Sequence, residues 1–214
     1  MTPSIPEWVR SFRLQGYRSA YELCPSEPRL FGTESLYGDW NAHTLLLAKD
    51  FGAASLVTRR LEQGDPRPYR HDPSLKTNRV LQRYVDPRTR SPNHASCGFL
   101  YGSALACLLR DDEKMSGSLP NRAAALAFGA DVFRFVRMNL PHLRRVMCLG
   151  REAWEVTASA EGLEAGWSAA RDAGTTVISG GLVFVASYHP AARVSREAMD
   201  RPWQLAQGTL TAAA

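Results

Sequence analysis

The sequence predicts an α/β fold in which a mainly parallel sheet is covered by helices on both faces. Short apolar runs that end in polar turns predict buried strands over 99–107, 146–150 and 182–187. Segments of ten or more residues with helical spacing separate most of these runs, and this alternation is typical of parallel sheets flanked by helices. The chain has 214 residues without an internal repeat or low-complexity linker. We therefore expect one domain over 1–214.

Helical spacing of apolar residues predicts helices over 6–23, 44–62 and 74–85, with a short buried strand over 29–32. The loop over 33–43 combines acidic, amide, histidine and aromatic side chains, and loops at strand ends often carry function. A polar connection with two buried aromatic residues is the alternative. The basic loop over 63–73 either contacts phosphates or is a solvated surface loop.

In the C-terminal half, Asn121 can cap a helix that runs to about residue 139. Gly150 leads from a strand into a helix over 151–160. The run over 175–178 is expected to pair with 182–187 as a hairpin through a glycine turn. A closing helix is expected over 196–208.

Charge and hydropathy exclude some classes of protein and leave others open. The net charge is +5 and the pI about 9.2, which is compatible with nucleic-acid binding and with a mildly basic enzyme. No run of 18 apolar residues predicts a membrane span, and the first residues do not resemble a signal peptide. We therefore expect a cytoplasmic protein that does not bind a membrane.

The four cysteines lie at positions 24, 97, 107 and 148, and no pair has metal-binding spacing. Cysteines within apolar runs usually act as small hydrophobic residues. We predict no metal site, no iron–sulfur cluster and no cofactor.

His189 directly follows the apolar strand over 182–187 and precedes Pro190, which cannot continue a sheet. Ligands of open α/β sheets bind at the carboxyl ends of the strands. His189, with Arg193 and Ser195 on the following loop, could therefore meet an anionic substrate. A histidine that only hydrogen-bonds a neighbouring loop is the alternative.

Three segments together resemble the uracil-DNA glycosylase superfamily. They are 30–35 (Leu-Phe-Gly-Thr-Glu-Ser), 146–153 (Val-Met-Cys-Leu-Gly-Arg-Glu-Ala) and 187–193 (Ser-Tyr-His-Pro-Ala-Ala-Arg), and the resemblance extends from about 29 to 205. It implies a three-layer α/β/α sandwich with a central, mainly parallel four-stranded sheet. It also implies that a target nucleotide is flipped out of DNA into a pocket.

The resemblance assigns the catalytic roles to two residues. Glu34 would activate water, and His189 would stabilise the negative charge that develops on the departing uracil. No metal would take part. No lysine lies near either motif in the sequence, which argues against Schiff-base lyase chemistry and for a monofunctional enzyme.

The resemblance also implies two groups of binding residues. Those that would contact the base are Gly32, Thr33, Ser35, Tyr37, Trp40 and Ser103. Those that would contact DNA through the loop after the second motif are Pro190, Ala191, Arg193 and Ser195. The superfamily's base-reading asparagine is replaced by Ser103, or Gly102, and Asp39 or Asn41 could supply what Ser103 does not.

The expected function is removal of uracil from single- or double-stranded DNA by a monomer, as in base excision repair. One alternative is a glycosylase for another deaminated base, such as hypoxanthine or xanthine. A second is a protein that binds uracil-containing or abasic DNA without turnover, and a third is a hydrolase of small nucleotides.

Overall fold

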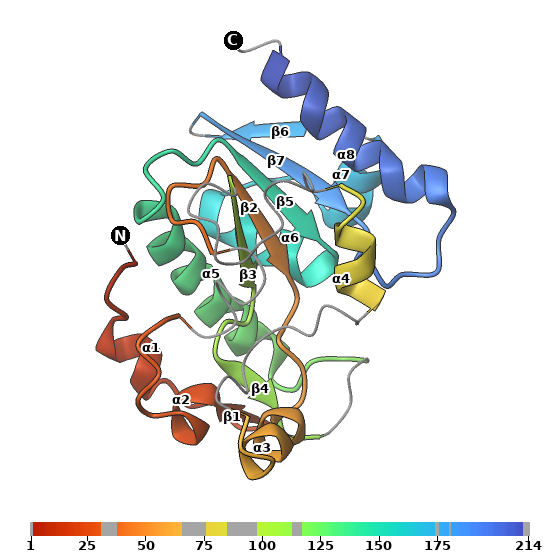
Figure 1. The fold of residues 1–214 in the computed structure, drawn as a ribbon. Coiled ribbons are helices and arrows are strands. Elements are labelled where there is room, and N and C mark those ends of the chain that lie inside the picture. Colours follow the sequence, from red (N-terminus) through yellow and green to blue (C-terminus); the bar gives the residue numbers. More distant parts are fainter. Residues whose placement is uncertain are drawn as a thin grey trace.

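The computed structural model describes residues 2–30, 38–65, 76–84, 98–112, 117–173, 176–179 and 181–211. Its main sheet has the strand order β3-β2-β5-β7-β6 (Figure 1). The strands are β2 (Thr44–Ala48), β3 (Phe99–Ser103), β5 (Arg145–Leu149), β6 (Thr176–Ser179) and β7 (Leu182–Ser187). β3, β2, β5 and β7 are mutually parallel, and β6 pairs with β7 in the antiparallel sense. This confirms the α/β prediction and adds an antiparallel fifth strand.

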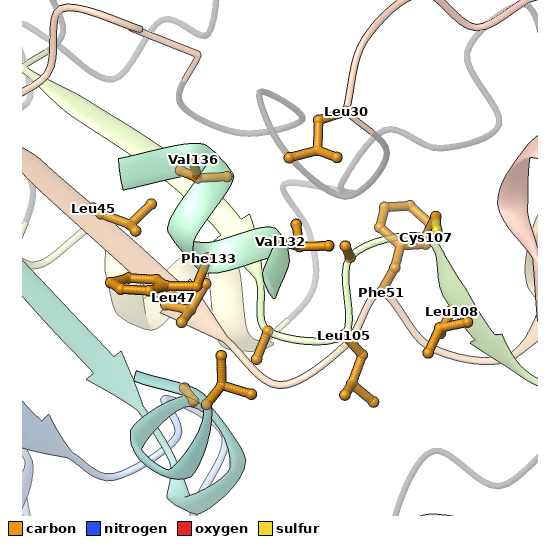
Figure 2. Packing of buried hydrophobic residues seen from close by; sticks show 14 of the residues in the cluster. Leu30, Leu45, Leu47, Phe51, Leu105, Cys107, Leu108, Val132, Phe133 and Val136 are labelled. Atoms are coloured by element: carbon orange, nitrogen blue, oxygen red, sulfur yellow. The ribbon is translucent and has the colours of Figure 1, made fainter. Parts of the chain in front are cut away.

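Helices cover both faces of the sheet, as the three-layer prediction requires. On one face, α5 (Arg122–Met138) and α6 (Arg151–Glu161) pack on Leu45 and Leu47 of β2 within the larger core cluster (Figure 2). On the other face, Leu46 and Ala48 belong to a second cluster that includes residues of α4 (Lys76–Leu81) and α8 (Arg196–Thr211). Side chains alternate between the faces of a strand, so β2 contributes to both clusters.

A separate group of short strands and helices lies outside the three layers, beyond the carboxyl ends of β2 and β3 (Figure 1). Here β1 (Tyr17–Ser19) pairs with β4 (Leu108–Arg110) in the antiparallel sense. Three short helices surround the pair: α1 (Glu7–Ser11), α2 (Ala20–Leu23) and α3 (Ala54–Glu62). The prediction of a single helix over 6–23 is therefore wrong, because this segment forms α1, β1 and α2. Ser19 and Glu22 form a capping box that begins α2 directly after β1.

The largest error of the sequence prediction concerns the first parallel strand. The segment predicted as a helix over 44–62 begins with strand β2, and only its second part is helix α3. Leu30 is buried but lies outside every strand, and the rest of the strand expected over 29–32 includes residues outside the described part. All five positions of β2 are buried, and a strand buried on both faces has no alternation to distinguish it from a helix.

The later elements follow the prediction closely, except for one cap and one added helix. Helices α5, α6 and α8 and the β6–β7 hairpin are confirmed, and α7 (Trp167–Ala173) is an additional helix. Asn121 precedes α5 but its side chain makes no capping hydrogen bond; its Nδ2 donates to the carbonyl of Gln15. Gly129 lets α5 approach the loop after β3, since a Cβ there would lie 2.3 Å from the oxygen of Ala104.

Candidate functional site at the carboxyl edge of the sheet

Four parallel strands bring different chemical groups to the same edge of the sheet. Lys49 and Asp50 follow β2, Gly150 follows β5, and His189 follows β7 by two residues, while Ser103 ends β3. This carboxyl edge is where ligands bind in open α/β sheets. Because β5 lies between β2 and β7, the strand end at Gly150 lies between the strand ends that lead to Asp50 and to His189.

The backbone on both sides of Asp50 is held in place. The amide of Ala104 donates to the carbonyl of Ala48 at 2.7 Å, and the amide of Leu105 donates to that of Lys49 at 3.0 Å. Phe51 belongs to the larger core cluster and anchors the segment from its other side (Figure 2). The sheet edge therefore presents the Asp50 carboxyl in a fixed position.

The Asp50 carboxyl is buried among charged groups. Its side chain is 11% exposed, and its Oδ2 lies 3.5 Å from Nζ of Lys49. Within the described residues that oxygen has no hydrogen-bond partner. Burial raises the pKa of Asp50 above its usual range, and the charge of Glu152 adds to the rise, whereas Lys49 and Arg110 oppose it. A buried carboxyl with a displaced pKa in a strand-end position is typical of functional sites.

The loop after β7 fixes both the position and the tautomer of His189. The amide of Ala191 donates a hydrogen bond to Nδ1 at 3.2 Å, and the amide of Ala192 donates to the His189 carbonyl at 2.8 Å. An Nδ1 that accepts a hydrogen bond leaves the proton of the neutral ring on Nε2. His189 is therefore built to donate from Nε2.

Electrostatics favour the neutral form of this histidine. Burial lowers the pKa of His189 and the nearby positive charge of Lys49 lowers it further, while Glu152 acts in the opposite direction. A neutral imidazole whose Nε2–H is already aimed can stabilise developing negative charge without proton transfer.

The residue before His189 is also held. The guanidinium of Arg171 lies 4.9 Å from the ring centroid of Tyr188 and 4.3 Å from that of Trp167. The Trp167 and Tyr188 rings meet edge to face at 6.1 Å. Contacts from α7 therefore support the start of the histidine loop.

Gly150 keeps the space beside His189 free of a side chain, since a Cβ there would lie 3.6 Å from the Cβ of His189. Its φ of 110° and ψ of 175° lie in a region that is essentially restricted to glycine. Its amide donates to the carbonyl of Ser187 at 3.0 Å, which ties β5 to the end of β7. Glu152, in the first turn of α6, interacts electrostatically with both Asp50 and His189.

Ser103 is the last residue of β3 and so lies at this edge, whereas the sequence predicts that the strand continues to residue 107. It is 4% exposed, and its Oγ has no hydrogen-bond partner in the described part of the chain. A cavity of about 10 Å³ beside it is lined by residues of β2, β3 and α5, including Leu47, Gly102 and Phe133. A buried hydroxyl without a partner is costly, and the cavity beside Ser103 is about the size of a single water molecule.

Several predicted site residues lie elsewhere or outside the described part. Those outside it are Gly32, Thr33, Glu34, Ser35 and Tyr37. Trp40 is 4% exposed and packs in the larger core cluster. Asp39 accepts hydrogen bonds from the amides of Asn41 and Gly98. Gly98 precedes β3, so Asp39 lies at the amino end of the sheet, and the idea that it could replace Ser103 is wrong.

The loop predicted to contact DNA contains both buried and exposed residues. Pro190 is buried, whereas Arg193 and Ser195 are exposed. The Oγ of Ser195 accepts a hydrogen bond from the amide of Ala198 and so caps the start of α8. Ala191 accepts a hydrogen bond from Nζ of Lys76 on α4. Arg193 is thus the residue of this loop with an exposed positive charge.

The expectation that no lysine lies near the motifs is wrong. Lys49 interacts with His189 as well as with Asp50, and Lys76 donates to the carbonyl of Ala191 at 3.3 Å. The sequence places these lysines 140 and 113 residues before His189, and only the fold brings them to the same loop.

Asp50 and Lys49 were missed because their segment was interpreted as a helix. The signal was nevertheless present: an apolar run over 44–48 ends in Lys-Asp-Phe-Gly, just as the run over 182–187 ends at Tyr-His-Pro. Within the described residues, no group of three histidine, cysteine or acidic side chains is arranged to hold a metal ion. The described helices include none that is long and apolar enough to cross a bilayer.

No family model matches the chain, and no curated protein matches it significantly.

Proposed function

We propose that this protein is a DNA glycosylase of the uracil-DNA glycosylase type, which flips uracil out of DNA and hydrolyses its N-glycosidic bond. The observation that carries the proposal is a buried carboxyl after β2 and a histidine after β7, at the ends of the two strands that flank β5 and Gly150. Asp50 has a raised pKa, and His189 has a lowered pKa and its donor on Nε2. These are the two groups that the reaction needs.

The departing base becomes an anion as the C1′–N bond breaks. The Nε2–H of His189 would donate to a carbonyl oxygen of uracil where that charge develops, and a donor already in place costs no reorganisation. Because His189 stays neutral, it donates a hydrogen bond to the departing base without transferring its proton. The base leaves with the bonding electron pair and is protonated from water.

The sugar develops positive charge and is attacked by water. Asp50 replaces Glu34 in our proposal as the carboxylate that holds this water, because its buried carboxyl, ion-paired with Lys49, lies at the same edge of the sheet as His189. As a carboxylate it also stabilises the positive sugar. The basic pI and exposed Arg193 support binding of the DNA backbone.

The test is uracil release from single- and double-stranded oligonucleotides by the wild type and four variants. We expect Asp50→Asn and His189→Ala each to slow release by about 10²–10³-fold. Asp131→Asn, an exposed carboxyl on α5, is the control and should retain the wild-type rate. Glu34→Gln shows whether the acid predicted from sequence contributes.

Retained rates in both Asp50→Asn and His189→Ala would contradict the proposal. Loss in Glu34→Gln with an unchanged rate in Asp50→Asn would return the water-activating role to Glu34. DNA binding without release of any base would indicate the non-catalytic alternative, and hydrolysis of free nucleotides alone would indicate the nucleotide hydrolase.

Ser103 favours a second candidate, a glycosylase for another deaminated base. Its unpartnered Oγ can donate or accept a hydrogen bond, and serine reaches less far than asparagine. Hypoxanthine and xanthine present carbonyl groups on a larger ring system. Oligonucleotides with each lesion separate the two candidates, and Ser103→Asn should shift the ratio of rates toward uracil if Ser103 contacts the base.

A further inference from the structure

Lys49 is a primary amine at the site that the hydrolysis proposed above does not use. Its side chain is 17% exposed, and its Nζ lies 3.5 Å from Oδ2 of Asp50. It also lies close enough to His189 to influence its titration. The amine therefore lies beside the carboxyl, and its charge acts on the histidine, the two groups that would hold the nucleotide.

We propose that Lys49 is the nucleophile of a second, lyase step at this site, in which its Nζ forms an imine with C1′ of the abasic deoxyribose. The inference rests on the proposed function for the origin of its substrate, since base release generates the abasic site. The Asp50 carboxyl that holds water for the first step would bring C1′ within reach of Nζ.

The neighbouring carboxyl gives the amine a route to its reactive form. An ammonium group has no free electron pair, so Lys49 must first lose a proton. Asp50 is the nearest acceptor, and its raised pKa makes it a better proton acceptor than an exposed aspartate. Lys76, the other described lysine near this loop, instead donates to the carbonyl of Ala191.

The step balances without an oxidant or a metal. The neutral amine adds to the aldehyde carbon C1′ of the ring-opened sugar, and the carbinolamine loses water to form a protonated imine. Loss of a proton from C2′ then expels the 3′-phosphate, whose C3′–O bond breaks with the electron pair leaving on oxygen. Water hydrolyses the imine, which frees Lys49 and an unsaturated aldehyde.

The test is reductive trapping with sodium borohydride, which converts the imine into a stable secondary amine. The wild type is incubated separately with a uracil oligonucleotide and with a preformed abasic oligonucleotide. The cross-linked residue is identified by peptide mass spectrometry. We expect a trapped complex at Lys49, loss of this complex in Lys49→Arg, and its retention in Lys76→Arg. Arginine preserves the charge but cannot form the imine.

The outcomes separate this inference from the proposed function. Uracil release without a trapped complex, or a complex mapped to Lys76 or the chain's amino terminus, overturns the lyase step and leaves the glycosylase proposal intact. Trapping at Lys49 on abasic DNA without release of any base supports the lyase step and overturns the glycosylase. Neither release nor trapping overturns both.

Discussion

Gly150 and His189 lie so close that a Cβ on the glycine would be 3.6 Å from the Cβ of the histidine. The histidine reaches the carboxyl edge across this glycine, which carries the backbone from β5 into α6. A side chain at position 150 would extend toward the loop that fixes the tautomer of His189. The backbone that connects β5 to α6 therefore helps to set the position of the His189 side chain.

Gly150→Ala is expected to destabilise the fold by about 1–3 kcal/mol, because alanine is strained at this φ and ψ. Gly162→Ala is the matched control. Gly162 also has a positive φ, 66°, but in the left-handed helical region, where a Cβ would meet no atom within 4 Å. Urea unfolding measures both variants. Equal losses of stability would show that the conformation of Gly150 carries no special cost.

Asp50→Asn is expected to stabilise the protein at neutral pH while it slows base release. The unfolded chain loses the Asp50 proton near pH 3.8, but the folded chain retains it to higher pH because burial raises the pKa. The folded state binds more protons between pH 3.8 and its own raised pKa, so its stability falls as pH rises through that window and stays lowered above it. Asparagine removes this loss.

Thermal unfolding of Asp50→Asn and the wild type between pH 7 and pH 4 tests this prediction. The advantage of the variant should be largest at pH 7 and should shrink as the pH approaches 3.8. Asp131→Asn serves as the control for loss of an exposed acid. A variant that is less stable than the wild type at pH 7 would mean that Asp50 is a stabilising structural carboxyl.

The His189 ring is expected to titrate below the usual 6.5, because burial and the charge of Lys49 lower its pKa. Lys49→Met should raise this pKa, since a repelling positive charge is removed, and Glu152→Gln should lower it. NMR titration of the ring protons measures all three proteins. Shifts in the opposite directions would show that the charges of Lys49 and Glu152 do not control the pKa of the His189 ring.

The lowered pKa of His189 also makes the stability of the fold depend on pH. The unfolded chain gains the His189 proton near pH 6.5, while the folded chain gains it at lower pH. Stability is therefore complete above about pH 6.5 and falls as pH drops from there toward the folded pKa. His189→Ala should remove this part of the acid dependence.

Local patterns in the sequence predict the α/β class, buried strands over 99–107, 146–150 and 182–187, and the position of His189 after a strand, although β3 ends at Ser103 rather than at 107. These features depend on local signals. Short apolar runs that stop at glycine or proline define strand ends, and the parallel arrangement places those ends at one edge. The helices α5, α6 and α8 follow from their spacing in the same way.

The acid and the amine at the His189 edge of the sheet follow from long-range strand pairing and not from local sequence. β2 is buried on both faces, so its periodicity does not separate it from the helix that follows, and Asp50 was hidden inside a predicted helix. Lys49 and His189 are 140 residues apart, and nothing local in the sequence relates them. β2 and β7 each pair with β5, on opposite sides of it, and this brings the two residues to the same edge of the sheet. Strand order in a sheet depends on long-range packing rather than on local pattern.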